Sequence, residues 1–314
     1  MREAFLVLLE VVAPIFAIIA AGYLSAARGF VDSAGFKGLN VFAFTLAAPA
    51  LLFASGTAGH QGGGAAAFAF FLGAGLLYAV VLWGARRAGM GLAAGGMLAL
   101  DVSYGNTVMM GIPLIVAAFG APGLSILLTI LALHSMVLLG VATVVAEIGQ
   151  NQRAAPWRLL RTTLAGVARN PVVMAVVLAM LWSTLALPVP GAARRTLELL
   201  GAAAPPVALF CLGGSLHGFD ARAAWRQMSV TVGLKLVALP ILVWLITSLM
   251  GLSELEIAVA TVTAALPTGA NAFLLARRYA VGTEASGASV LVSTLLSLVT
   301  LTALLALFRN TTVF

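Results

Sequence analysis

Two stretches of the chain mix polar side chains, glycine and proline within apolar sequence. The first is DVSYGNTVMMGIP at 101–113, and the second is ALPTGAN at 265–271. Proline removes a backbone donor and clashes with the preceding turn, so we expect each helix to kink or unwind at Pro113 and Pro267. A helix that restarts after a break presents free N–H groups and a positive dipole end, which suits a carboxylate. The two stretches therefore predict an anion site.

Seven residues of these stretches are the candidates for contacting the anion. They are Asn106, Thr107, Pro113, Pro267, Thr268, Gly269 and Asn271. The two asparagines can add side-chain amide donors, and Tyr104 is a weaker candidate. The alternative is that the prolines only bend the helices for packing and the asparagines cap the breaks.

Three ionisable residues fall inside apolar segments: Asp101, Lys235 and His134. Such residues are costly within a membrane and are usually functional or paired. Asp101 and Lys235 lie at a similar depth from the same side, so they could form an ion pair, with a proton-carrying role for Asp101 as the alternative. For His134 we expect a packed, hydrogen-bonded ring rather than a proton relay.

The elements that hold these residues are predicted to be membrane helices. Of 314 residues, 62% are apolar and 9% charged, and the mean hydropathy is +1.10. A soluble protein of this size could not cover its surface with so few charges. About 20 apolar residues cross the hydrocarbon layer as a helix. Ten segments qualify: 4–26, 36–56, 63–85, 92–119, 122–148, 169–187, 196–216, 226–250, 255–278 and 285–308.

Several function classes are excluded by what the sequence lacks. A single cysteine, Cys211, and three scattered histidines give no disulfide framework and no zinc pattern. No Gly-x-x-x-x-Gly-Lys loop is present, so ATP hydrolysis is not expected. The net charge of +7 is assigned to cytoplasmic loops rather than to nucleic acid. We expect no cofactor and no metal, and we leave the coupling ion open, with a proton as one candidate.

The distribution of basic residues predicts the orientation. Twelve of the 17 lysines and arginines fall in the odd-numbered loops, four lie on the opposite side, and Lys235 lies within a span. Because basic residues resist translocation, the odd-numbered loops are expected to be cytoplasmic and both termini outside. We expect a multi-pass protein of a bacterial inner membrane.

The prolines repeat at half the length of the chain. Pro14 recurs as Pro171 and Pro49 as Pro206, both 157 positions later, and Pro113 and Pro267 are 154 apart. Five spans in each half would invert the second half relative to the first. Inverted repeats are typical of secondary transporters, whose broken helices meet at a midplane site. We therefore expect one membrane domain over 1–314, with repeats 1–150 and 165–314.

The motifs around the two breaks resemble those of the auxin efflux carrier family, which includes plant auxin exporters and bacterial carriers of malonate and other organic acids. The resemblance rests on four motifs spread from about residue 10 to 305. They are Asn106–Thr107 with Gly111–Leu114, Ala265–Pro267 with Gly269, Phe273, Ala276 and Tyr279, Asn170–Pro171, and Pro206 with Ala208–Phe210.

The resemblance implies an all-α fold of ten helices in two inverted five-helix repeats, with crossed broken helices 4 and 9. Helices 1, 2, 6 and 7 would form a scaffold that often dimerises, so a homodimer is expected. Helices 3–5 and 8–10 would form a mobile transport unit with an elevator-like motion. It also implies that Asn106 contacts an organic anion and that Pro113 and Pro267 shape the site. Span nine has Ala270 and Asn271 where plant exporters are apolar, which argues against auxin as cargo.

The predicted function is secondary active transport of a small mono- or dicarboxylate across the inner membrane. Within transporters, a sodium-coupled bile acid-type symporter and a cation–proton antiporter are the alternatives. An antiporter needs clustered carboxylates at the crossover, but Asp101 stands alone and no carboxylate lies between Glu256 and Glu284. A membrane sensor or receptor is the alternative of another class. An enzyme is not expected, because no nucleophile with a base and no metal cluster is recognisable.

Overall fold

The computed structural model describes residues 12–57, 63–150, 171–217 and 224–308, and this part of the chain is helical, with one isolated β-bridge and no strand. The α-helices are α2 (Ala13–Ala27), α3 (Ser33–Phe42), α4 (Ala48–Gly56), α5 (Gly64–Arg87), α6 (Leu92–Ser103), α7 (Ile112–Gly149), α9 (Pro171–Thr184), α10 (Gly191–Ala202), α11 (Ala204–Leu216), α12 (Trp225–Gly233), α13 (Leu239–Leu249), α14 (Glu254–Ala265), α15 (Ala270–Arg278) and α16 (Thr283–Leu307). Three π-helical turns join them: η2 (Ala43–Ala47), η3 (Thr107–Gly111) and η4 (Leu234–Ala238).

Six helical segments of the described chain are long and apolar enough to cross a membrane. They are Ser33–Gly56, Gly64–Arg87, Thr107–Gly149, Gly191–Leu216, Trp225–Leu249 and Thr283–Leu307. Ala13–Ala27, Leu92–Ser103 and Pro171–Thr184 are apolar but shorter. The chain is therefore a multi-pass helical membrane protein. Ten crossings in two inverted repeats stay a prediction, and the expected connection between the repeats, with Asn170, lies outside the described residues.

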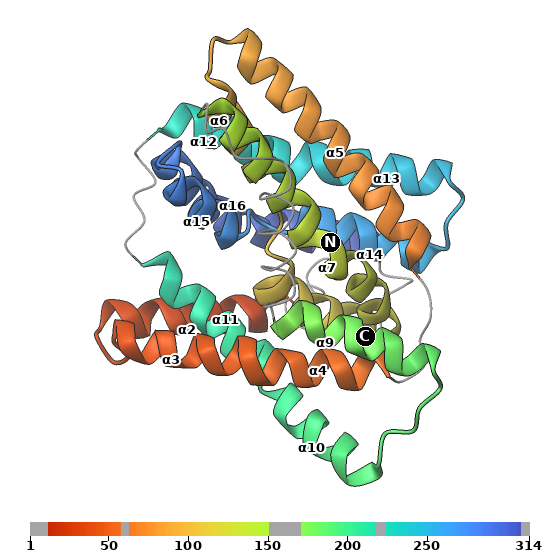
Figure 1. Ribbon diagram of the computed structural model, residues 1–314. Coiled ribbons are helices and arrows are strands. Elements are labelled where there is room, and N and C mark those ends of the chain that lie inside the picture. Colours follow the sequence, from red (N-terminus) through yellow and green to blue (C-terminus); the bar gives the residue numbers. More distant parts are fainter. Residues whose placement is uncertain (1–11, 58–62, 151–170, 218–223, 309–314) are drawn as a thin grey trace.

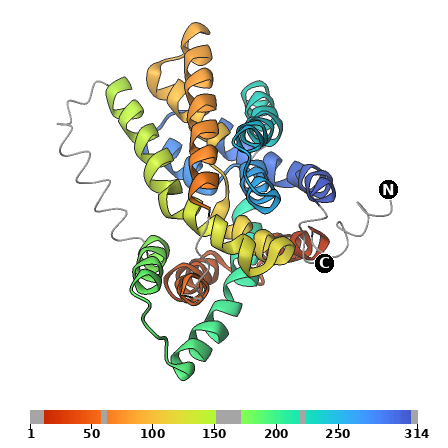
Figure 2. The ribbon, with the colours of Figure 1, turned by 90° about the vertical axis from the view of Figure 1, so that its right-hand side faces the viewer.

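The helices pack in two groups, seen in Figures 1 and 2. In the lower group α2 packs on α11, and α4 packs on α9 and α10. In the upper group α5 packs on α6 and α13, while α16 packs on α12 and α15. The long helix α7 contacts members of both groups. The broken helices lie deepest, since almost every residue of 95–103 and 258–265 is buried.

Two glycines let α2 and α11 approach to backbone contact. A Cβ on Gly22 would stand 2.0 Å from the carbonyl oxygen of Phe210, and one on Gly213 would stand 1.8 Å from that of Ile19. Small residues that admit such close approach are typical of helix pairs in membranes, where packing rather than water exclusion drives association.

Each π-helical turn is followed by a proline two residues after its end: Pro49, Pro113 and Pro240. A proline ring clashes with the carbonyl four residues earlier, and a wider turn at that point relieves the clash. The sequence thus dictates these irregularities, and η4 is the turn that carries Lys235.

The two breaks differ in their relation to proline. The second break spans Leu266–Gly269 and contains Pro267, as predicted. The first spans Tyr104–Asn106, so the chain unwinds seven residues before Pro113. Just before Pro113 itself, the irregularity is the π-helical turn η3. Pro113 lies within the helical run Thr107–Gly149, where the wider turn η3 accommodates its ring and the helix continues. Within α7 the backbone is non-helical at Gly120, with φ 62° and ψ −155°, so two helices meet at a kink there, between the predicted spans 92–119 and 122–148.

Candidate functional site

The two breaks pair with each other as a short antiparallel bridge between Gly105 and Thr268. The N–H of Asn106 donates to the Pro267 carbonyl at 2.8 Å, and the N–H of Gly269 donates to the Tyr104 carbonyl at 3.0 Å. Unwound backbone at membrane depth must be satisfied by protein or by a watery cavity. Here each break satisfies part of the other, so the segments 101–113 and 265–271 are brought together as predicted.

The bridge requires glycine at position 269. A Cβ there would lie 2.7 Å from two carbons of the Tyr104 ring and 2.9 Å from the Gly105 carbonyl oxygen. Both distances are shorter than real Cβ contacts, and one of the atoms is backbone that cannot rotate away. Gly269 therefore allows the backbone of the first break to approach closely enough to form the bridge.

Thr268 ties the bridge to α6 and α16. Its hydroxyl donates to the Asp101 carbonyl at 3.0 Å, and its N–H donates to Ser293 Oγ at 3.0 Å. The residue is fully buried. Its polar groups are thus used within the protein, and the side chain does not face the cavity.

A cavity of about 570 Å³ lies beside the bridge, between the two groups of helices. Its lining comes from both breaks, from η3 and α15 that follow them, and from α3, η2, α7, α9 and α11. Of the seven predicted contacts, Asn106, Thr107, Gly269 and Asn271 line it. Pro113, Pro267 and Thr268 are not among the lining residues.

Tyr104 joins the polar groups of the cavity wall. Its hydroxyl accepts from Asn271 Nδ2 at 3.1 Å and shares a hydrogen bond of 2.9 Å with Ser135 Oγ. These side chains come from the first break, α15 and α7, so one hydroxyl fixes three elements around the cavity. The Asn106 Nδ2 group is buried without a hydrogen-bond partner among the described residues. It is therefore an unused hydrogen-bond donor on a residue that lines the cavity.

Two helix beginnings meet at this cavity. The helical run Thr107–Gly149 starts directly after Asn106, and α15 starts after Gly269; neither start has a side-chain cap. The first N–H groups of a helix lack intrahelical partners and carry about half a positive charge. The cavity therefore offers backbone donors and positive potential from two directions, an arrangement that suits an anion.

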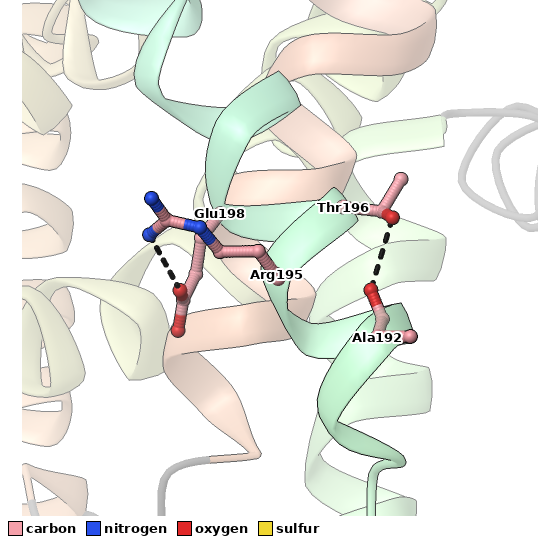
Figure 3. Close-up of polar contacts among 4 residues, drawn as sticks. All are labelled: Ala192, Arg195, Thr196 and Glu198. Carbon is pink, nitrogen blue, oxygen red and sulfur yellow. Dashed lines mark hydrogen bonds and ion pairs between the residues drawn. The ribbon is translucent and has the colours of Figure 1, made fainter.

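The expected ion pair between Asp101 and Lys235 is not formed. Ser286 Oγ donates to Asp101 Oδ1 at 2.6 Å, whereas Lys235 Nζ donates to the Ala264 carbonyl at 2.6 Å. Asp101 is thereby tied to α16 and Lys235 to the end of α14. In the described part of the chain the ion pair found is the exposed one between Arg195 and Glu198 on α10, 3.8 Å apart (Figure 3).

His134 is a packed residue behind the cavity wall. Its ring centroid is 4.5 Å from that of Tyr104, and its Nδ1 is 3.4 Å from Thr107 Oγ1. Its Nε2 is buried with no partner in the described residues. The ring supports two residues of the wall and does not itself line the cavity.

Some site residues were missed from the sequence. Asn40, Phe44, Ser135 and Ser215 line the cavity from helices that carry no break. On α16, Ser286, Ser289, Ser293 and Ser297 are all fully buried. Their three- and four-residue spacing in an apolar helix predicts one polar stripe, and this signal could have located the partners of Asp101 and Thr268.

Comparison with known proteins decides the family. The family model described as "Membrane transport protein" matches residues 7–305. The chain belongs to the membrane transport protein family. The resemblance to the auxin efflux carriers is confirmed. A protein of Rhizobium meliloti (strain 1021), named "Putative malonate transporter", is 28% identical over 309 residues, which cover 95% of each chain.

Membership of the membrane transport protein family makes this chain a transporter rather than an enzyme, as predicted. The match covers both breaks and the helices around the cavity.

Proposed function

We propose that the protein is a secondary active transporter that binds a small organic anion, such as a mono- or dicarboxylate, in the cavity beside the bridge. One observation carries the proposal: two uncapped helix beginnings and the unpartnered Asn106 amide meet at one cavity. The name of the Rhizobium meliloti protein makes malonate the first cargo to test.

The proposal includes an architecture and a motion. The lower helix group corresponds to predicted spans 1, 2, 6 and 7 and would be the scaffold, through which two copies dimerise. The upper group with α7 would be the transport unit, moving as an elevator. The ten spans would form inverted repeats in a bacterial inner membrane, with both termini outside. The position of the cavity between the two groups favours this division, because sliding one group would carry the site across.

Binding by purified protein tests the proposal. A ligand that binds only the folded state raises the melting temperature in proportion to the logarithm of its concentration. Malonate should stabilise the wild-type protein and stabilise Asn106→Ala far less. Thr196→Ala is the matched control, because Thr196 lies exposed on α10 and its hydroxyl bonds only the Ala192 carbonyl (Figure 3). If no mono- or dicarboxylate stabilises the wild-type protein, the proposed function is wrong.

A further inference from the structure

Lys235 is a fully buried lysine close to the bridge, next to Gly105. Its Nζ donates to the Ala264 carbonyl, in the last turn of α14 just before the second break. No carboxylate of the described residues lies within 4.0 Å of it. The carbonyl end of a helix carries about half a negative charge, so it offsets only part of the lysine charge.

The Lys235 amine is separated from the cavity by Gly105. Nζ is 3.6 Å from the point where a Cβ on Gly105 would stand, and Gly105 lines the cavity, as does the adjacent Asn106. Lys235 itself is not among the lining residues. The lysine can therefore act on a bound anion through its electric field, without a hydrogen bond to it.

Burying a charge without a counter-ion is costly, and the cost falls when an opposite charge arrives nearby. In a site of low polarity, the Coulomb attraction across one or two residues is weakened much less than in water. Asp101 forms no ion pair with Lys235: its carboxylate accepts from Ser286, and the Lys235 amine donates to the Ala264 carbonyl instead. The free place for a negative charge near Lys235 is the cavity.

We propose that Lys235 is a specificity-determining residue: its ammonium is the counter-charge of the cargo across Gly105, and it makes the cavity prefer dianions to monoanions. This inference rests on the proposed function. The positive helix ends also attract a dianion more strongly than a monoanion. The contribution of Lys235 is therefore the part of the preference that is lost when its charge is removed.

The experiment compares dissociation constants at pH 7 for malonate, a dianion, and monomethyl malonate, a monoanion of similar size. We expect the wild-type protein to bind malonate at least tenfold more tightly. Lys235→Gln retains an amide that can donate to the Ala264 carbonyl but removes the charge. It should weaken malonate binding about tenfold or more, weaken monomethyl malonate binding several-fold less, and so shrink the preference. Lys37→Gln removes the other lysine, which is exposed on α3, and should leave the preference unchanged.

A larger loss of affinity for malonate than for monomethyl malonate in Lys235→Gln distinguishes an electrostatic role of Lys235 from a structural one. If Lys235→Gln keeps the wild-type preference, or weakens both ligands equally, the inference is overturned while the proposed function stands. If the wild-type protein binds no carboxylate, the inference about Lys235 and the proposed function are both wrong. Lys235→Met, with an apolar side chain of similar length, replaces Lys235→Gln should the latter fail to fold. If neither folds, the wild-type protein decides, because equal affinity for the two ligands overturns the inference.

Discussion

The main-chain N–H of Asn106 donates to the carbonyl of Pro267, 161 positions away in the chain, at 2.8 Å. This bond and its partner from Gly269 to Tyr104 join two broken helices into one element. The side chains of Asn106 and Asn271 are thereby held on the same cavity wall. The site depends on backbone pairing as much as on side chains.

Replacing Gly269 with alanine should disrupt the bridge. The added methyl would meet the Tyr104 ring at 2.7 Å and the Gly105 carbonyl at 2.9 Å. Overpacking of this kind costs about 1–3 kcal/mol, so the melting temperature in detergent should fall and malonate should no longer raise it. Gly84→Ala in α5 is the control, because a Cβ there meets nothing within 4 Å. Wild-type melting and binding in Gly269→Ala would show that the bridge tolerates a side chain.

Thr268→Val should destabilise the bridge, because it removes one hydrogen bond with little change in side-chain volume. It removes the hydroxyl that donates to the Asp101 carbonyl and leaves that acceptor buried. Such a loss costs about 1–3 kcal/mol, which calorimetric or fluorescence melting can detect. Thr196→Val on exposed α10 should melt like the wild-type protein. Equal melting of the two variants would contradict a supporting role for Thr268.

Tyr104→Phe should weaken cargo binding more than it weakens the fold. The hydroxyl orients Asn271 and bonds Ser135 at the cavity wall, so its removal frees both side chains. We expect the malonate dissociation constant to rise about three- to tenfold, or roughly 0.7–1.4 kcal/mol, as measured by titration calorimetry. Tyr78→Phe is a matched control, because the Tyr78 hydroxyl is buried with no partner among the described residues. Unchanged affinity in Tyr104→Phe would remove Tyr104 from the site.

Asp101→Asn tests whether the buried carboxyl carries the coupling proton. The amide can still accept the Ser286 bond but cannot exchange a proton. We expect the variant to exchange malonate for malonate, yet its net uptake should no longer respond to an imposed pH gradient. Glu284→Gln, an exposed change in the first turn of α16, should respond as the wild-type protein does. A full response in Asp101→Asn would assign the coupling ion elsewhere.

The helices and the second break could be predicted from the sequence, because apolar length and Pro267 are local signals. The position of the first break within 101–113 could not, since η3 accommodates Pro113 in a helical run and the unwinding at Gly105 depends on pairing with Thr268. The partners of Asp101 and Lys235 also escaped prediction. The sequence places Asp101 and Lys235 at the same depth in the membrane but does not give the rotation of each helix about its own axis. That rotation determines which neighbour each side chain reaches, Ser286 for Asp101 and Ala264 for Lys235.

Counterflow of labelled malonate into proteoliposomes preloaded with unlabelled malonate tests most directly whether cargo binds in the cavity beside the bridge. Wild-type protein should accumulate label transiently, and Thr196→Ala should match it. Asn106→Ala should lose at least nine-tenths of the initial rate while eluting from size-exclusion chromatography as the wild-type protein does. A wild-type rate in Asn106→Ala would contradict the claim that cargo binds in the cavity at the crossing of the broken helices.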